Sequence, residues 1–489
     1  MIRNLVDYVD ERLGVSPGAR KLLRYIFPDH WSFLLGEIAL YAFIVLVGTG
    51  VFMSLYYVPS DAEAVYRGAY EPLRGLTMTE SYLSTVNLSL EVPAGLLMRQ
   101  THHWAANLMI IAIVLHLLRI LLTGAFRKPR EINYLVGVTL LTLTVLEGFV
   151  GYSMPDDLFS GIGLVISYGV ALSIPVFGAD LAFLIWGAEY PGSSDFFPRL
   201  YIVHVLIVPV AIAGLIGMHM AMIMRQHHAQ FPSKLATERN VVGYPMWPGY
   251  ALKAGGLMFL TAAVLFLLGG LVQINPIWQW GPYEPYLASN GAQPDWYLGW
   301  LLGSLRLMPA LEIQLGDLTL VPNAFWGGLV FPTITFMLMY AWPWIDRRWF
   351  GDRDKHDLLD SPRDNPRRTA IVISYFAWVL IIFIAGSIDR LYLSSTVPYE
   401  AQVWFLRIAV IVLPFVVYFA TKRLCEELSA REPRPLRGWT GKVVRRTPAG
   451  GFETVELDEG VPAVDGANGR NGGPVVKEEA GAGEGARGS

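Results

Sequence analysis

The chain has 489 residues, of which 53% are hydrophobic and 16% charged, and its formal net charge at pH 7 is −3. This composition excludes an ordinary soluble domain and is typical of a protein that crosses a membrane several times. The basic residues are dispersed, so the long basic face of a nucleic-acid-binding protein is absent from the sequence. The single cysteine, Cys425, excludes a disulfide framework and any motif that needs two cysteines.

Eight apolar stretches are long enough to cross the hydrocarbon layer, which takes roughly 20 helical residues. They lie at 33–57, 104–124, 134–154, 200–224, 251–273, 324–344, 369–388 and 402–421. Acidic residues and no apolar run precede the first stretch, so the N-terminus does not read as a cleavable signal peptide. We expect an all-α polytopic membrane protein with eight transmembrane helices.

Basic residues are concentrated in the loops after the second, fourth and sixth stretches. The loop after the second contains Arg127, Lys128 and Arg130, and the loop after the fourth contains Arg225, Lys234 and Arg239. The loop after the sixth contains Arg347, Arg348, Arg353, Lys355, Arg363, Arg367 and Arg368. By the positive-inside rule these loops and both termini lie in the cytoplasm. The opposite loops then face outward, and the one at about 274–323 is long enough to carry function. Residues from about 430 lose hydrophobicity, and we expect the end of this tail to be disordered.

Four histidines on the second and fourth stretches form a pattern. His102 and His116 are fourteen residues apart, which leaves their side chains about 40° apart around a helix, whereas His103 and His116 differ by about 140°. His204 and His219 are fifteen apart, or about 60°. The two helices run in the same direction, so His102 and His204 lie near the outer side, and His116 and His219 lie nearer the cytoplasm.

The two histidines of each helix lie about 21 Å apart along its axis. One metal ion cannot bind both, because ligand atoms lie about 2 Å from a metal. We therefore predict two sites, each with one histidine from each helix and each holding a non-covalent haem b. Iron with two imidazole ligands has no open position and serves electron transfer. The alternative, histidines that are hydrogen-bonded to neighbours within the bundle, is disfavoured by their matched depths.

Glycines repeat the spacing of fourteen on the first and third stretches, as Gly36 and Gly50 and as Gly137 and Gly151. A flat haem needs flanking positions without a side chain at its depth, although glycine also serves helix packing in membranes. Arg99, one turn before His102, and Arg119, one turn after His116, stand where haem propionates need cationic partners. The alternative is that both arginines extend to the membrane surface.

Two motifs resemble the cytochrome b family: THHWAANLMIIAIVLHLLRILLTGAFRKPRE at 101–131 and RLYIVHVLIVPVAIAGLIGMH at 199–219. GAQPDWY at 291–297 is similar to the family's Pro-Glu-Trp-Tyr motif, which lines the quinol oxidation site. GGLVQINPIWQWGPY at 269–283 and LLDSPRDNPRRTA at 358–370 resemble the cytochrome b subunit of actinobacterial menaquinol-oxidising complexes. The resemblance covers roughly residues 30–425.

The resemblance implies a quinol–cytochrome c reductase subunit of the respiratory chain in a bacterial plasma membrane. Residues 33–230 would form a four-helix di-haem domain and 231–425 a second four-helix domain, between cytoplasmic segments at 1–32 and 426–489. Electrons would pass from an outer quinol site through two haems to an inner quinone site, coupled to proton translocation in a Q cycle. Menaquinone is favoured over ubiquinone. Implied partners are membrane lipid, a Rieske iron–sulfur subunit and a cytochrome c subunit, in a family often docked to a cytochrome c oxidase.

The resemblance also implies the site residues. Pro294, Asp295, Trp296 and Tyr297 would line the outer quinol site. Asp295, as proton acceptor, stands where the family usually has the longer Glu; the alternative is an aspartate that fixes a turn. Leu34 stands where the b6 branch has a haem-binding cysteine, so we expect no third haem.

Three further residues are candidates near the quinone sites. We hypothesise that Glu147 assists proton release, the alternative being a structural carboxylate paired inside the bundle. The resemblance implies an inner quinone site at the cytoplasmic end of the fourth stretch, where Arg225 and His228 follow His219. The ordinary pKa of histidine, near 6.5, suits His228 to proton delivery. His227 is a competing candidate, and the segment could also be a basic helix end.

Two other classes of protein share part of this pattern. A di-haem anchor subunit of a dehydrogenase would carry histidine pairs but has no need of Pro-Asp-Trp-Tyr in an outer loop. A transporter could use intramembrane His and Glu as a proton relay. Reduced-minus-oxidised spectra distinguish them, because the transporter has no b-type haem absorption.

Overall fold

The computed structural model describes residue 8, residues 10–233, 235–286 and 293–431, and the strands at 442–446 and 452–456. Within these residues eight helices are long and apolar enough to cross a membrane, which confirms the predicted all-α, multi-pass class. The spans are Trp31–Ser54, Gly95–Thr123, Glu131–Ser153, Phe196–Gln226, Met246–Leu271, Asn323–Phe350, Pro366–Gly386 and Tyr399–Ala430.

The spans are built from one helix or from two consecutive helices. They contain α3 (Leu34–Ser54), α5 (Gly95–Thr123), α6 (Glu131–Ser153), α9 (Phe196–Ile202) with α10 (Val208–Gln226), α11 (Ala251–Leu271), α14 (Asn323–Phe325) with α15 (Phe331–Phe350), α16 (Pro366–Gly386) and α18 (Tyr399–Arg431). Wider helical turns at Val203–Ile207, Met246–Tyr250 and Trp326–Val330 complete the fourth, fifth and sixth spans. Gly124 ends α5 with φ 67°, a left-handed conformation that glycine adopts without strain.

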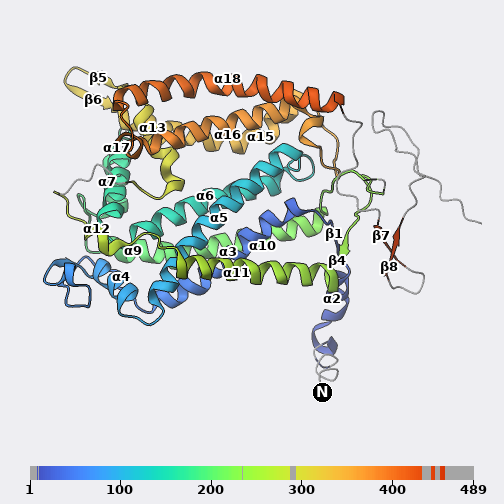
Figure 1. Ribbon diagram of the computed structural model, residues 1–489, viewed down its shortest axis with the longest axis horizontal. Helices are drawn as coiled ribbons and strands as arrows, with labels where there is room; N and C mark the ends of the chain where they lie inside the picture. Colours follow the sequence, from blue (N-terminus) through green and yellow to red (C-terminus); the bar gives the residue numbers. More distant parts are fainter. Residues whose placement is uncertain are drawn as a thin grey trace, which may run out of the picture. The chain divides into compact units, whose positions relative to one another are not determined.

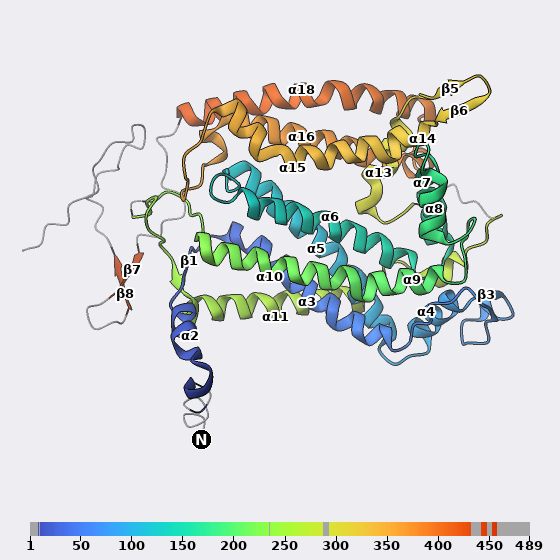
Figure 2. The ribbon, with the colours of Figure 1, turned by 180° about the vertical axis from the view of Figure 1, so that it is seen from behind.

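The long helices lie side by side in layers (Figures 1 and 2). α15, α16 and α18 run along one side, α3, α10 and α11 run along the other, and α5 and α6 lie between them. α5 packs against α3 and α6, and α6 packs against α10. α11 belongs to the predicted second domain but packs against α3 and α5. The division into domains stays a prediction.

One end of the bundle, here called the α7 end, carries most of the short elements (Figure 1). They are α4 (Glu80–Leu90), α7 (Leu158–Leu172), α8 (Gly178–Trp186), α12 (Ile277–Trp280), α13 (Gly299–Leu307), α17 (Ile388–Leu393), turns at Glu71–Leu73 and Trp296–Leu298, and the antiparallel pairs β2 (Glu63–Val65) with β3 (Thr77–Thr79) and β5 (Ile313–Leu315) with β6 (Leu318–Val321). The long loop predicted at 274–323 is thus largely structured where it is described.

The opposite end, here called the β1 end, carries α2 (Val15–Leu23), β1 (Ile26–Phe27), β4 (Tyr244–Pro245) and turns at Trp31–Phe33 and Pro362–Asp364. β1 and β4 pair antiparallel, with Phe27 opposite Tyr244. A Cβ on Gly243 would collide with the Phe27 carbonyl oxygen, so glycine is required for this close approach. The pairing fixes the segment before α3 against the segment before α11.

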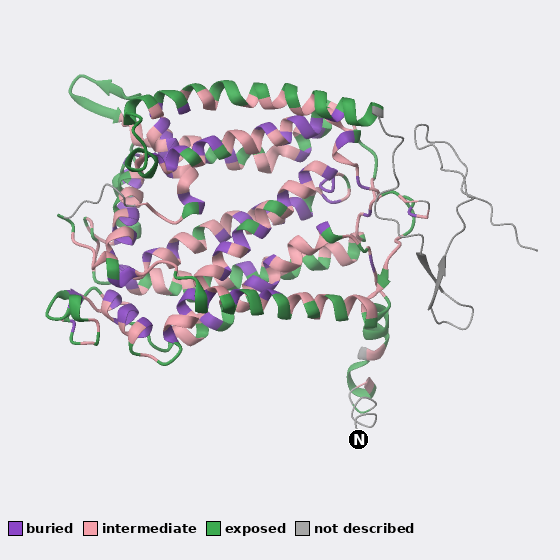
Figure 3. Ribbon diagram, in the orientation of Figure 1, coloured by how far each residue is buried: buried purple, intermediate pink, exposed green. Residues whose placement is uncertain are grey.

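Burial differs strongly between the layers (Figure 3). Buried residues are frequent along α5 and α6, whereas α18 is exposed along most of its length. Its exposed side chains include Phe405 at 70% and Phe415 at 65%. A soluble protein rarely exposes a continuous apolar surface, so this face contacts lipid.

The described strands at 442–446 and 452–456 belong to a unit separate from the helices. In it β7 (Lys442–Arg446) pairs antiparallel with β8 (Phe452–Glu456). The prediction of a disordered end falls on residues that lie outside the described part of the chain.

Candidate functional site

The imidazoles of His102 and His204 face each other near the α7 end. Their ring centres are 6.3 Å apart and the ring planes cross at 67°. Two imidazoles that bind one metal ion from opposite sides, each through a bond of about 2 Å, have ring centres about 6 Å apart. The separation therefore suits two axial ligands of a single iron ion.

Oxygen atoms lie against Nδ1 of both of these imidazoles. The Thr49 hydroxyl donates to the Val45 carbonyl oxygen at 2.7 Å, so it accepts a hydrogen bond from His102 Nδ1 at 2.9 Å. Glu147 Oε1 lies 2.9 Å from His204 Nδ1, an ion-pair contact without hydrogen-bond geometry. With Nδ1 of both rings facing an oxygen, Nε2 is left to bind a metal.

Each histidine of the two predicted pairs lies against one of the four glycines. A Cβ on Gly50 would lie 3.4 Å from His102 Cε1, and one on Gly151 would overlap the His204 ring. A Cβ on Gly36 would lie 3.2 Å from His116 Cε1, and one on Gly137 would lie 3.7 Å from His219 Cε1. The glycines thus lie at the same two depths as the histidines, and each one lets an imidazole ring approach the helix backbone closely.

His116 and His219 are close enough to interact electrostatically. Nδ1 of each ring is buried and has no hydrogen-bond partner among the described residues. Arg119 lies over the Phe33 ring at 4.4 Å, and its buried Nε and Nη2 also have no partner in the described part of the chain. Buried polar groups are normally satisfied. The guanidinium of Arg119 would therefore suit an anionic group at this level.

Arg99 is buried, and its Nη2 donates to the Asn275 carbonyl oxygen at 2.8 Å. Its Nε is buried and lacks a partner within the described residues. Arg99 also lines the cavity that contains His102 and His204. It therefore retains one free donor for an anionic group at that level.

This cavity, of about 130 Å³, reaches beyond the histidine pair to Asp295 and Tyr297. His103 lines it too, and its Nε2 lies 2.9 Å and 3.2 Å from the two Asp295 carboxylate oxygens. His103 thus faces Asp295 across this cavity. No signal in the sequence indicated this contact, because the two residues are 192 positions apart.

The Pro-Asp-Trp-Tyr segment is held against α5 and α6. Trp296 Nε1 donates to Asn107 Oδ1 at 2.7 Å. Tyr297 is buried, and a Cβ on Gly148 would lie 2.8 Å from its hydroxyl oxygen. Burial, and then the Asp295 carboxylate, raise the pKa of Tyr297 well above its usual range. Tyr297 is therefore a neutral hydrogen-bond donor at the cavity wall.

Two further carboxylates lie beside this region, after the end of α6. Asp156 Oδ2 accepts from the Thr79 hydroxyl at 2.8 Å, and Asp157 caps α7 by accepting from Phe159 N at 3.1 Å. Burial raises the pKa of Asp156 to about 7 and that of Asp157 to about 6. Sequence reasoning did not single out either residue.

At the β1 end, the three candidates for the inner quinone site differ in exposure. Arg225 and His227 are exposed, whereas His228 is half-buried with the edge of Phe27 against it at 4.8 Å between ring centres. Burial, and then the guanidinium groups of Arg130 and Arg119, lower the pKa of His228 to about 4. His228 is therefore neutral at pH 7.

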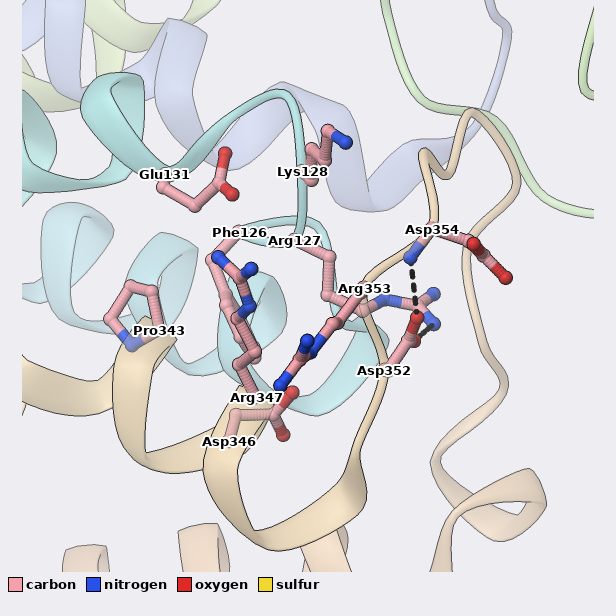
Figure 4. A pocket seen from close by; sticks show the side chains of 10 residues that line it. All are labelled: Phe126, Arg127, Lys128, Glu131, Pro343, Asp346, Arg347, Asp352, Arg353 and Asp354. Carbon is pink, nitrogen blue, oxygen red and sulfur yellow. Dashed lines mark hydrogen bonds and ion pairs between the residues drawn. The ribbon is translucent and has the colours of Figure 1, made fainter.

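A second pocket at this end is lined by charged groups (Figure 4). Arg127 pairs with Asp352 at 3.2 Å and with Asp360 at 2.9 Å, and the buried Arg368 bonds Asp346 at 2.7 Å and Asp360 at 2.5 Å. These ion pairs join the loop after α5 to α15 and to the start of α16. The network is structural, because its three carboxylates and two guanidinium groups pair with one another.

Comparisons with known proteins agree with this arrangement. A family model described as cytochrome b(N-terminal)/b6/petB matches residues 107–282. The chain is 42% identical to the cytochrome bc1 complex cytochrome b subunit of Streptomyces coelicolor, over 93% of this chain and 83% of that protein. It is also 42% identical to the subunits of the same name from Mycobacterium leprae, over 94% and 82%, and Corynebacterium diphtheriae, over 97% and 86%.

The fold has a solved counterpart. The structure titled "Hyperthermophilic respiratory Complex III" matches 85% of this chain and 100% of its own with a TM-score of 0.59 at 20% identity, a likeness of fold alone. The family assignment rests on the sequence relatives, which confirm the resemblance found in the motifs. They also imply a haem b cofactor and partner subunits. The chain belongs to the cytochrome b subunits of cytochrome bc1 complexes.

Proposed function

We propose that this chain is the di-haem subunit of a quinol–cytochrome c reductase that oxidises menaquinol at the α7 end and reduces quinone at the β1 end. The observation that carries the proposal is the cavity shared by His102, His204, Asp295 and Tyr297. A proton acceptor and an electron acceptor for the same quinol would meet there.

Each site has its own residues in this proposal. His102 and His204 hold the outer haem b, and His116 and His219 hold the inner one, with Arg99 and Arg119 as propionate partners. The haems supply one-electron transfer when bound. Thr49 and Glu147 orient the outer ligands through Nδ1. This role favours the alternative in which Glu147 is a structural carboxylate paired inside the bundle.

Asp295 accepts a quinol proton in this proposal, and His103 orients its carboxylate. Tyr297 donates to the quinol oxygen, while Pro294 and Trp296 shape the wall. His228 lines the inner site as a neutral group, and Arg225 supplies positive charge nearby. The α7 end faces outward and both termini lie in the cytoplasm of a bacterial cell, by the distribution of basic residues. A Rieske protein and a cytochrome c subunit accept the outer electron, and the cycle is a Q cycle.

The test is the pair Asp295→Asn and Asp295→Glu in the assembled complex. Loss of a positioned proton acceptor lowers a rate by about 10²–10⁴-fold. We expect that loss of quinol oxidation in Asp295→Asn, with b-type absorption intact, and substantial activity in Asp295→Glu, which restores the family's usual residue. Unchanged oxidation in Asp295→Asn contradicts the role of Asp295, and absence of b-type absorption from the unmodified complex contradicts the whole proposal.

A further inference from the structure

Glu37 is a carboxylate in the first membrane helix. It has no role in the electron transfer proposed above. It lies in the first turn of α3 and is half-buried. Its neighbour Gly36 faces the ring of His116, which places Glu37 at the level of the inner histidine pair. A carboxylate at such a position is costly unless it is partnered, and intramembrane carboxylates commonly carry protons.

Two tyrosine hydroxyls bind this carboxylate. Tyr250, from the turn before α11, donates to Glu37 Oε1 at 2.5 Å. Tyr41, one turn further along α3, donates to Glu37 Oε2 at 3.1 Å. Both of these partners are neutral groups. Neither fixes a permanent negative charge on Glu37 as a guanidinium would, so the carboxyl is free to gain and lose a proton.

Aromatic contacts connect this carboxylate to the inner quinone site. Tyr250 stacks on Phe27 with ring centres 4.0 Å apart and planes at 9°. Phe27 then meets His228 edge-on at 4.8 Å. The β1–β4 pairing brings Phe27 and the turn before α11 together. Glu37, Tyr250, Phe27 and His228 therefore form a continuous chain of contacts from α3 to the end of α10.

Exposed charged groups lie beside this chain of contacts. Lys253 follows Tyr250 by three residues and so lies on the same face of the helix. Its Nζ pairs with Asp29 at 2.9 Å, and about half of each side chain is exposed, 52% for Lys253 and 48% for Asp29. An exposed ion pair therefore lies within one helical turn of Tyr250 at the β1 end.

We propose that Glu37 relays protons from the β1 end to the inner quinone through the hydroxyl group of Tyr250. The inference rests on the proposed function, in which the quinone receives two electrons through the histidine pairs in successive turnovers. Reduction of one quinone to quinol also consumes two protons. Once Glu37 is protonated, its carboxyl O–H donates to the Tyr250 oxygen and gives its proton there as the Tyr250 hydroxyl proton passes to a quinone oxygen. The Glu37 carboxylate that results accepts from both tyrosines, and it is then reprotonated from water beside Asp29 and Lys253.

The test is Glu37→Gln in the full complex, because glutamine keeps the size of the side chain and cannot carry a proton. Stopped-flow spectra follow reduction of the b haems by quinol and reoxidation of the inner haem by quinone. We expect reduction at the normal rate and reoxidation slowed at least about tenfold, with a changed solvent isotope effect. Glu37→Asp should partly restore the rate. Glu131→Gln is the matched control, in the first turn of α6 at the same end, and should match the unmodified complex.

Tyr250→Phe provides a second test, since it removes the relay hydroxyl and leaves Glu37 in place. It should slow the same step and spare haem reduction. Reoxidation at the normal rate in both Glu37→Gln and Tyr250→Phe, with full haem content, overturns the inference. A slowed step with an unchanged isotope effect and no rescue by Glu37→Asp also overturns it, because Glu37 would then be only structural. If quinol fails to reduce any b haem in the unmodified complex, the proposed function fails instead.

Discussion

Replacing Thr49 by valine isolates one hydrogen bond of the proposed outer haem site. Thr49 is buried, and valine keeps its shape while removing the hydroxyl that accepts from His102 Nδ1. The change leaves a buried N–H group without its acceptor, which costs about 1–3 kcal/mol. Loss of such a partner of a metal ligand lowers metal affinity by about 10–100-fold. His116 lies about four helical turns from His102 along α5, and Thr49 makes no hydrogen bond to it.

The assay is release of haem from the purified complex to a scavenging apoprotein, combined with a reductive titration. We expect the outer component in Thr49→Val to leave about 10–100 times faster, with a shifted midpoint potential, and the inner component to stay unchanged. Thr49→Ser keeps the hydroxyl and should behave as the unmodified protein. Loss of the inner component, or a Thr49→Val protein identical to the unmodified one in both, would refute the reasoning.

Two more predictions follow from the packing and from the buried acids. Gly151→Ala should remove the outer spectral component, because the new Cβ overlaps the His204 ring. Gly137→Ala should keep both components, because its Cβ would lie 3.7 Å from the His219 ring. Equal haem content in the two variants would contradict this prediction. Asp156 holds its proton more tightly when folded, with a pKa of about 7 against an ordinary 3.8, so the free energy of unfolding falls as pH rises between these values. Asp156→Asn should therefore raise the thermal stability most at pH 8 and hardly at all below pH 4; an equal gain at both pH values, measured by thermal inactivation, would show that the pKa shift is not the cause.

The helices, and the shared face of His102 and His116 on one of them, follow from the sequence because both depend on local periodicity. An apolar stretch of about 20 residues has few alternatives to a membrane helix, and the rotation per residue alone places His102 and His116 on one face. The same rotation separated His103 from that face. These arguments need no knowledge of which helices become neighbours.

The remaining contacts join segments far apart in the chain, so no local pattern reports them. His103 meets Asp295 across 192 residues, and Glu37 meets Tyr250 across 213. Both contacts depend on how a loop folds back onto the bundle. The shift in the pKa of His228 has the same origin, because burial and the guanidinium groups that cause it come from several segments.

The most direct test of the central claim, two haem sites at two depths, is a set of four histidine variants examined by reduced-minus-oxidised spectra. The account predicts that His102→Leu and His204→Leu remove one b-type component, and that His116→Leu and His219→Leu remove the other. If His102→Leu and His116→Leu instead remove the same component, with the complex assembled, the pairing across α5 and α10 is wrong.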